Sequence, residues 1–139
     1  MIESAALLSA PLTEFAVRDY LRTRSAVKSC VGNDSRRIDL DYSGTGNYLV
    51  MYRAGGAPRS TLPLDTAILT FHCYGSTRHA AALLEAALVT VLQSLNAQNL
   101  NDDTYCQAAS VLSRGAWLPT SDGRARYIVT AGVTARRVA

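Results

Sequence analysis

A strand, a tight turn and a helix follow one another between residues 65 and 95, and this unit constrains the fold most. Residues 66–74 are mostly β-branched, aromatic or apolar, which predicts an interior strand that is largely buried. Gly75 ends this strand. Ser76 or Thr77 then provides a side chain that can cap a helix, and the residues that follow include neither proline nor glycine up to the end of the unit, which predicts a long helix.

The predicted helix has two contrasting faces. We expect one apolar stripe at helical spacing to pack into the core, and it consists of Ala80, Leu84, Ala87, Leu88, Val91, Leu92 and Leu95. The second face carries Ala82, Leu83, Ala86, Val89 and Thr90. Glu85 is the only charged residue after His79, whereas a helix face in water usually carries several charges. We therefore expect either the rest of the chain or a neighbouring subunit to cover the second face.

The whole chain, residues 1–139, predicts a single α+β domain in which a mixed, mainly antiparallel sheet packs against two main helices. The other expected elements are a helix over 11–22, a short strand within 37–42, a loop at 43–47, a strand over 48–52 that stops at 53–56, a link over 57–63, a polar connection at 96–103, an extended stretch over 104–117, a turn at 118–123 and a final strand over 125–136.

The final strand alternates most clearly, which predicts one buried and one polar side. Ala125, Tyr127, Val129, Ala131, Val133 and Ala135 are expected to face inward. Arg124, Arg126, Thr130, Thr134 and Arg136 are expected to face outward. Together with the extended stretch before it, this strand predicts an antiparallel hairpin.

The composition excludes several classes of protein. A content of 48% hydrophobic and 18% charged residues excludes a disordered chain, and the apolar runs are too short to span a bilayer. The net charge of +3 is too small to indicate nucleic-acid binding. An acidic residue, Glu3, stands where a signal peptide carries basic ones, so we expect synthesis in the cytoplasm.

No motif predicts catalysis. The only histidines, His72 and His79, and the three widely spaced cysteines lack the spacing of a metal site or a disulfide framework. Asp39 and Asp41 share a predicted strand face, where paired carboxylates are usually just solvated. No nucleophile motif is present either, so we expect neither an enzyme nor a cofactor.

Two glycine-rich loops and the start of the long helix are the candidate partner contacts. The loops are Ser43–Asn47, with Gly44 and Gly46, and Ala54–Pro63, with Gly55, Gly56 and Arg59. Arg78 opposes the helix dipole, a cost that either an acidic partner or screening by salt would offset. With Arg78, the second helix face at Ala82, Leu83, Ala86 and Val89 completes the expected interface.

The order of these elements resembles the tail terminator proteins of long-tailed, siphovirus-type bacteriophages, especially those of actinobacterial hosts. The resemblance covers roughly residues 11–136, and the Ser25–Asn47 segment departs from the family's usual short, proline-containing version. Its motifs are an apolar strand ending in Gly-Gly (Leu49–Gly56), a strand ending in Tyr-Gly-Ser-Thr (Ala67–Thr77), an alanine-rich helix (Ala80–Leu95) and a Trp-Leu-Pro-x-x-Asp-Gly-Arg-x-Arg-Tyr run into an alternating strand (Trp117–Arg136).

The resemblance implies a structural virion protein, assembled in the host cytoplasm, that forms a homo-hexameric ring on the tail tube. Such a ring ends polymerisation of the tube protein and offers a surface on which the filled head, with its head-completion or stopper protein, docks. The double-stranded DNA genome passes through the lumen without sequence-specific binding. The alternatives are a head-completion or adaptor protein of the same neck and, from a different class, a small enzyme with an unassigned site.

Overall fold

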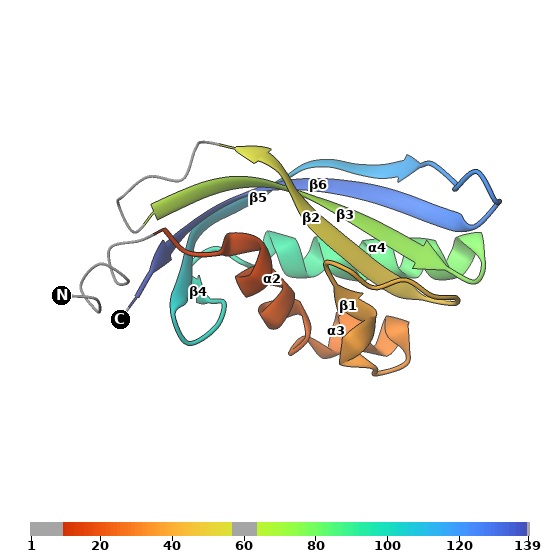
Figure 1. Cartoon of the computed structure of the whole chain (residues 1–139), viewed down its shortest axis with the longest axis horizontal. Coiled ribbons are helices and arrows are strands. Elements are labelled where there is room, and N and C mark those ends of the chain that lie inside the picture. The colour runs from red at the N-terminus through yellow and green to blue at the C-terminus, as the bar shows by residue number, and fades with distance from the viewer. Residues whose placement is uncertain (1–9, 57–63, 139) are drawn as a thin grey trace.

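The computed structural model describes residues 10–56 and 64–138, which form one six-stranded sheet with every helix on the same face (Figure 1). The strand order is β1-β2-β3-β6-β5-β4, and all pairings are antiparallel except the parallel β1–β2 pair. The elements are α2 (Thr13–Leu21), α3 (Ser25–Lys28), the 3₁₀ turns η1 (Ser29–Val31) and η2 (Ser35–Arg37), β1 (Ile38–Asp39), β2 (Tyr48–Gly56), β3 (Leu64–Gly75), α4 (Arg78–Gln93), β4 (Gln98–Asn99), β5 (Thr104–Trp117) and β6 (Ala125–Arg137). The predicted α+β class is confirmed.

The predicted strand, turn and helix are confirmed as β3 and α4. The side chain of Thr77 caps the helix, because its Oγ1 accepts a hydrogen bond from the backbone N–H of Ala80 at 3.1 Å. The turn is tight at Gly75, where an added Cβ would lie only 2.3 Å from the backbone nitrogen of Ala81. Glycine is therefore the residue that lets the chain reverse from the middle of the sheet onto its covered face.

The core lies between α4 and the sheet. Leu84, Leu88 and Leu92 of α4 are buried in the same hydrophobic cluster as Phe71 of β3 and Val129 of β6. Most of the predicted core stripe is confirmed, but Ala80 and Ala87 are only half-buried. The buried side of the final strand is confirmed at Val129, Ala131, Val133 and Ala135, and the β5–β6 hairpin is also present.

Helix α2 forms as predicted, and part of its predicted apolar stripe packs into the core. The helical spacing of Leu12, Phe15, Ala16 and Tyr20 predicts that these four side chains are buried together. Ala16 and Tyr20 are buried, as are Val17 and Leu21, but Leu12 and Phe15 are 53% and 40% exposed. The orientation has a polar cause. Thr13 donates a hydrogen bond from its Oγ1 to the buried Asp65 Oδ2 at 2.5 Å, and this contact turns the start of the helix toward β3.

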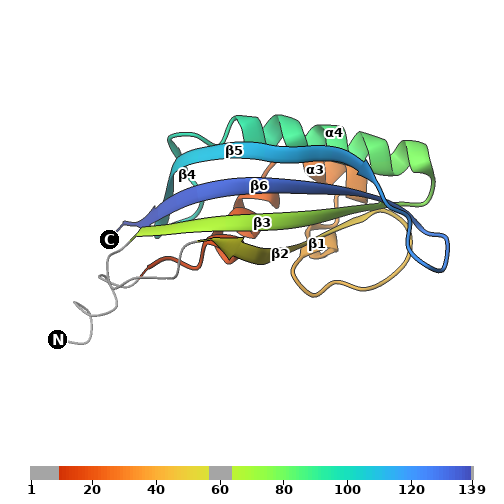
Figure 2. The same ribbon diagram turned by 90° about the horizontal axis from the view of Figure 1, so that it is seen from above.

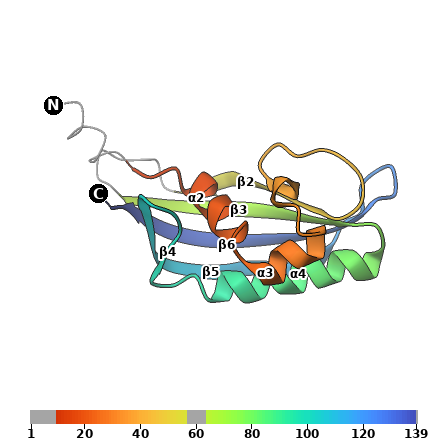
Figure 3. The same cartoon turned by 90° about the horizontal axis from the view of Figure 1, so that it is seen from below.

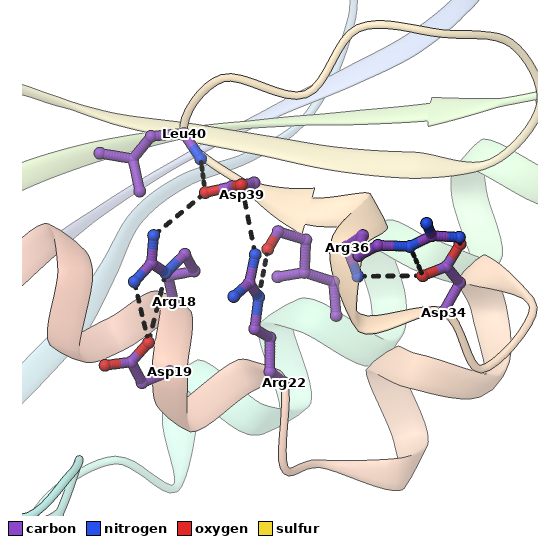
Figure 4. Close-up of polar contacts among 8 residues, drawn as sticks. Arg18, Asp19, Arg22, Asp34, Arg36, Asp39 and Leu40 are labelled. Atoms are coloured by element: carbon purple, nitrogen blue, oxygen red, sulfur yellow. Dashed lines mark hydrogen bonds and ion pairs between the residues drawn. The ribbon is translucent and has the colours of Figure 1, made fainter.

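Residues 25–47 contain α3, η1, η2 and β1, and the two residues of β1 confirm the short strand expected within 37–42. Ion pairs bind this segment to α2, because Asp39 accepts from Arg18 at 3.2 Å and lies 3.2 Å from an Arg22 nitrogen (Figure 4). Partial burial alone would raise the pKa of Asp39, but the Leu40 N–H and the two guanidiniums outweigh it and hold the pKa below its usual value. The prediction that Asp39 is merely solvated is wrong.

Strand β2 continues through the glycine pair that was expected to end it. A bulge between Arg53 and Gly55 resets the register, and Gly55 and Gly56 then pair with Ile68 and Ala67. Gly56 has a φ of +117°, and an added Cβ would lie 2.3 Å from the Thr66 carbonyl oxygen. The prediction of a loop at this pair is wrong, because glycine serves here to bring two strands close together.

The other face of the sheet carries no helix of the described chain, and we call it the open face (Figure 2). Seen from below, the helices lie against the opposite face (Figure 3). The open face is lined by Tyr48, Val50 and Tyr52 of β2, Thr66, Ile68, Thr70, His72 and Tyr74 of β3, Ala108, Ser110 and Leu112 of β5, and Arg126, Ile128, Thr130, Gly132, Thr134 and Arg136 of β6.

Candidate subunit and partner interfaces

The side of α4 turned away from the core is the first candidate interface. Leu83 is 52% exposed, Ala86 and Thr90 are exposed, and Ala82 is half-buried. The described chain therefore leaves this surface largely uncovered. Val89 was assigned to it from the sequence, but it is 1% exposed and belongs to the core, because α4 is broadly buried between the sheet and α3. We call Ala82, Leu83, Ala86 and Thr90 the outer face of α4.

Glu85 lies beside the outer face of α4 but is itself buried. Its carboxylate accepts hydrogen bonds from Arg114 Nε at 3.2 Å, from Arg114 Nη2 at 2.8 Å and from the backbone N–H of Gly115 at 2.7 Å. The only carboxylate of the helix is thus used inside the subunit, against β5. The outer face of α4 therefore carries no charged side chain.

A basic, aromatic cavity at the start of α4 is the second candidate interface. It has a volume of about 460 Å³, and its lining includes Gly46, Thr77, Arg78, Trp117 and Arg124. Three segments far apart in the sequence meet here, namely the loop before β2, the β3–α4 turn and the β5–β6 turn. The cavity joins Gly46 and Arg78, two residues predicted independently as partner contacts.

Aromatic rings hold the arginines at this cavity. The Arg78 guanidinium lies 4.4 Å from the ring centre of Trp117, and its Nε donates to the Tyr127 hydroxyl at 3.0 Å. These contacts place a cation at the N-terminus of α4, where the helix dipole is also positive. The first turn of α4 contains no acidic residue. Asp122 also lines the cavity and lies 3.4 Å from Arg124, so two arginines face a single carboxylate in its lining.

Arg124 stabilises the neighbouring loop. Its guanidinium donates to the hydroxyl of Tyr48 and to the Gly44 carbonyl oxygen, and it lies 5.2 Å from the ring centre of Tyr74. The Tyr48 and Tyr74 rings stack at 4.4 Å. The predicted loop residue Gly44 is therefore tied to the β5–β6 turn, and both segments border the same cavity.

The remaining predicted contacts lie elsewhere. Gly55 and Gly56 pair with Ile68 and Ala67, toward the opposite end of β3 from the cavity. Arg59 lies outside the described residues. The predicted site residues are therefore spread over the two ends of the sheet and the outer face of α4.

The histidines and cysteines form no cluster in the described part of the chain that could hold a metal ion. His72 is half-buried on the open face, and burial, aided by the charge of Arg126, lowers its pKa. Cys73 points into the core, as strand alternation predicts, and burial strongly raises its pKa. Burial also raises the pKa of Cys106 to about 11, so both thiols remain protonated at neutral pH.

The sequence reasoning missed the aromatic residues around the cavity. Tyr48, Tyr74, Trp117 and Tyr127 come from four strands and meet only when the sheet forms. The available signal was the run of Arg124, Arg126 and Tyr127 at the start of the final strand, because arginine guanidiniums often lie over aromatic rings.

Within the described residues, no helix is both long and apolar enough to cross a bilayer. No protein-family model matches the chain, and no curated protein sequence matches it.

Proposed function

We propose that this protein is a structural component of a phage tail that assembles as a ring on the end of the tail tube. The ring ends polymerisation of the tube protein and presents a docking surface to the head or its completion protein. Six copies close the ring, and the genome passes through its lumen. The copy number and the partners come from the sequence resemblance described above.

One observation carries the proposal, namely that the subunit has two uncharged surfaces on different sides that its described residues leave uncovered. The outer face of α4 and the central part of the open face both contain exposed leucine or isoleucine side chains. A ring subunit must bury two different surfaces against its two neighbours. Exposed apolar surface of this kind typically marks a contact with another protein.

The basic cavity supports the second half of the proposal, the docking of a partner. It lies at one end of the sheet, one helical turn before the outer face of α4 begins at Ala82. A ring that leaves this end of the subunit open would keep the cavity accessible. Arg78 and Arg124 would favour an acidic segment of the docking protein.

A capping assay tests this function. Purified protein is added to polymerising tail-tube protein and, separately, to filled heads. A tail terminator shortens the tubes and is bound at one tube end, whereas a head-completion or adaptor protein binds the heads and leaves tube length unchanged. Binding to neither particle would contradict a role in the neck. Arg78→Ala should leave tube capping intact while weakening the docking of the head, and Ser121→Ala, at an exposed residue of the β5–β6 turn, is its matched control.

A further inference from the structure

A shallow hollow lies on the open face of the sheet, across β3, β6 and β5. Its volume is about 240 Å³, and its lining includes Thr66, Ala108, Ser110, Gly132 and Thr134. The hollow exists because every one of these side chains is small. Gly132 lies between Ser110 and Leu112, and a Cβ added to it would come within 3.9 Å of the Ser110 Oγ and 3.8 Å of a Leu112 methyl carbon.

Apolar side chains border this hollow. Leu112 is 57% exposed on one side, and Ile68, which pairs with Gly132, is 36% exposed on the other. A hollow lined by small residues and flanked by apolar ones fits a protruding aliphatic side chain. The outer face of α4 carries such a side chain in Leu83, with small residues on either side of it.

We propose that the outer face of α4 of one copy packs into this hollow of the next copy, with Leu83 inserted between Leu112 and Ile68. The proposal rests on the ring function proposed above and names the two surfaces that join its subunits. Each subunit uses a different surface toward each neighbour, so the contact is heterologous and closes into a ring when the rotation per subunit permits.

Charge argues against the alternative in which two open faces pack on each other. Arg126 and Arg136 lie toward opposite ends of the open face on β6, and none of its described residues is an aspartate or glutamate. A two-fold contact with its axis parallel or perpendicular to β6 would bring arginine against arginine, without a carboxylate to offset the repulsion. The outer face of α4 is uncharged, so it meets the hollow without that cost.

The size of the open face suits an interface between two copies. Strands about 4.8 Å apart that rise about 3.3 Å per residue give four strands of roughly ten residues a face of about 600 Å². A contact that buried about 600 Å² on each copy would bury about 1,200 Å² in total, the lower end of the range for specific interfaces. The α4 helix, at about 1.5 Å per residue, is roughly 24 Å long and fits within the length of these strands.

Cysteine cross-linking of the full-length chain tests the contact. Cys30, the only native cysteine that is not buried, is first replaced by serine, and Leu83→Cys and Ser110→Cys are then made separately in that background. The two proteins are mixed at high concentration and oxidised mildly. We expect a cross-linked dimer in the mixture and not in either protein alone. Leu83→Cys mixed with Ser121→Cys, whose residue lies in the exposed β5–β6 turn, is the matched control.

Four results would overturn the inference. Leu83→Cys alone forming dimers would indicate a contact between two helices, and Ser110→Cys alone forming dimers would indicate a contact between two sheets. Assembly detected by native mass spectrometry without the mixed cross-link would mean that the ring closes through other surfaces. Self-association weaker than about 1 mM would also overturn it. In each case the capping assay decides the proposed function separately, because it measures tube length and not the subunit contact.

Discussion

Glu85 and Arg114 form a bidentate ion pair in which the carboxylate is buried and the guanidinium is half exposed, with side-chain exposures of 5% and 52%. The pair joins the middle of α4 to β5. Glu85 also accepts the backbone N–H of Gly115, a residue in the left-handed conformation with a φ of +70°. This contact stabilises an irregular part of β5 and removes the only acidic group of α4 from its surface.

The asymmetric burial of this pair predicts an asymmetric response to mutation. Arg114→Ala should cost about 1–3 kcal/mol, because it leaves a buried carboxylate without its counter-ion. Glu85→Gln should cost less, since an amide oxygen can still accept from Gly115 and the exposed arginine can be solvated. The double variant should recover part of the loss caused by Arg114→Ala. Urea unfolding of all four proteins measures this cycle, and equal costs for the two single variants would contradict it.

Leu88 and Leu83 are five residues apart on one helix, but truncating them should change the free energy of unfolding by very different amounts. Leu88→Ala should destabilise the subunit by about 2–5 kcal/mol, because its side chain is fully buried in the core. Leu83→Ala should change the free energy of unfolding by less than about 0.5 kcal/mol in dilute solution. A large loss for Leu83→Ala at low concentration would mean that the subunit itself covers the outer face of α4.

Gly75 and Gly55 provide a matched pair of glycine substitutions. Gly75→Ala should cost at least about 1–3 kcal/mol, because the added Cβ would meet the backbone of Ala81. Gly55→Ala should be tolerated, since an added Cβ there meets no atom of the described chain within 4 Å. Thermal unfolding of the two variants checks the prediction, and similar melting temperatures would contradict the tight turn between β3 and α4.

The lowered pKa of Asp39 predicts a pH-dependent contribution to stability. Its ionised form is favoured in the folded state, so the contribution is fully present above the pKa of the unfolded chain, about 3.9, and is lost as the pH falls through the lower folded pKa. Asp39→Asn should therefore destabilise the protein by about 1 kcal/mol at pH 7 and by less below about pH 4. A pH-independent difference in urea unfolding would contradict this, and Asp41→Asn, at an exposed carboxylate, is the control.

The outer face of α4 should tolerate a charge in the isolated subunit but not in the ring. Ala86→Glu should leave the far-UV circular dichroism and the melting temperature unchanged, because Ala86 is exposed. Ring assembly should weaken, since the new carboxylate would be buried against a neighbouring copy. Ser121→Glu adds the same charge in the β5–β6 turn and should have no effect. If Ala86→Glu assembles as well as the parent, other surfaces join the subunits.

Local patterns in the sequence predicted the main elements but not how they face one another. The capping residue Thr77, the alternation in β6 and the stripe around Leu88 depend on short-range spacing, and all three are confirmed. The buried face of α2 was predicted only in part, because Thr13 at the start of the helix makes a buried polar contact with Asp65, 52 residues away. The spacing of neighbouring residues in the sequence cannot predict a contact between residues so far apart.

The candidate site was also predictable only in part, because its residues are far apart in the sequence. Arg78 and Gly46 were identified singly, but the cavity that joins them depends on Trp117 and Arg124 from the distant hairpin. Val89 was assigned to the surface because helical spacing alone cannot show how wide the buried stripe is. The Gly55–Gly56 pair was read as a loop because a bulge within a strand uses the same residue type.

Electron microscopy that seeks this protein in phage particles tests the central claim most directly. A gold-labelled antibody against the chain, or density identified by cryo-electron microscopy, locates it in the particle. The proposed function predicts a single ring of six copies where the tail tube meets the head, with the basic cavity accessible at one face of the ring. Copies distributed along the tube, or absence of the protein from the finished particle, would contradict it.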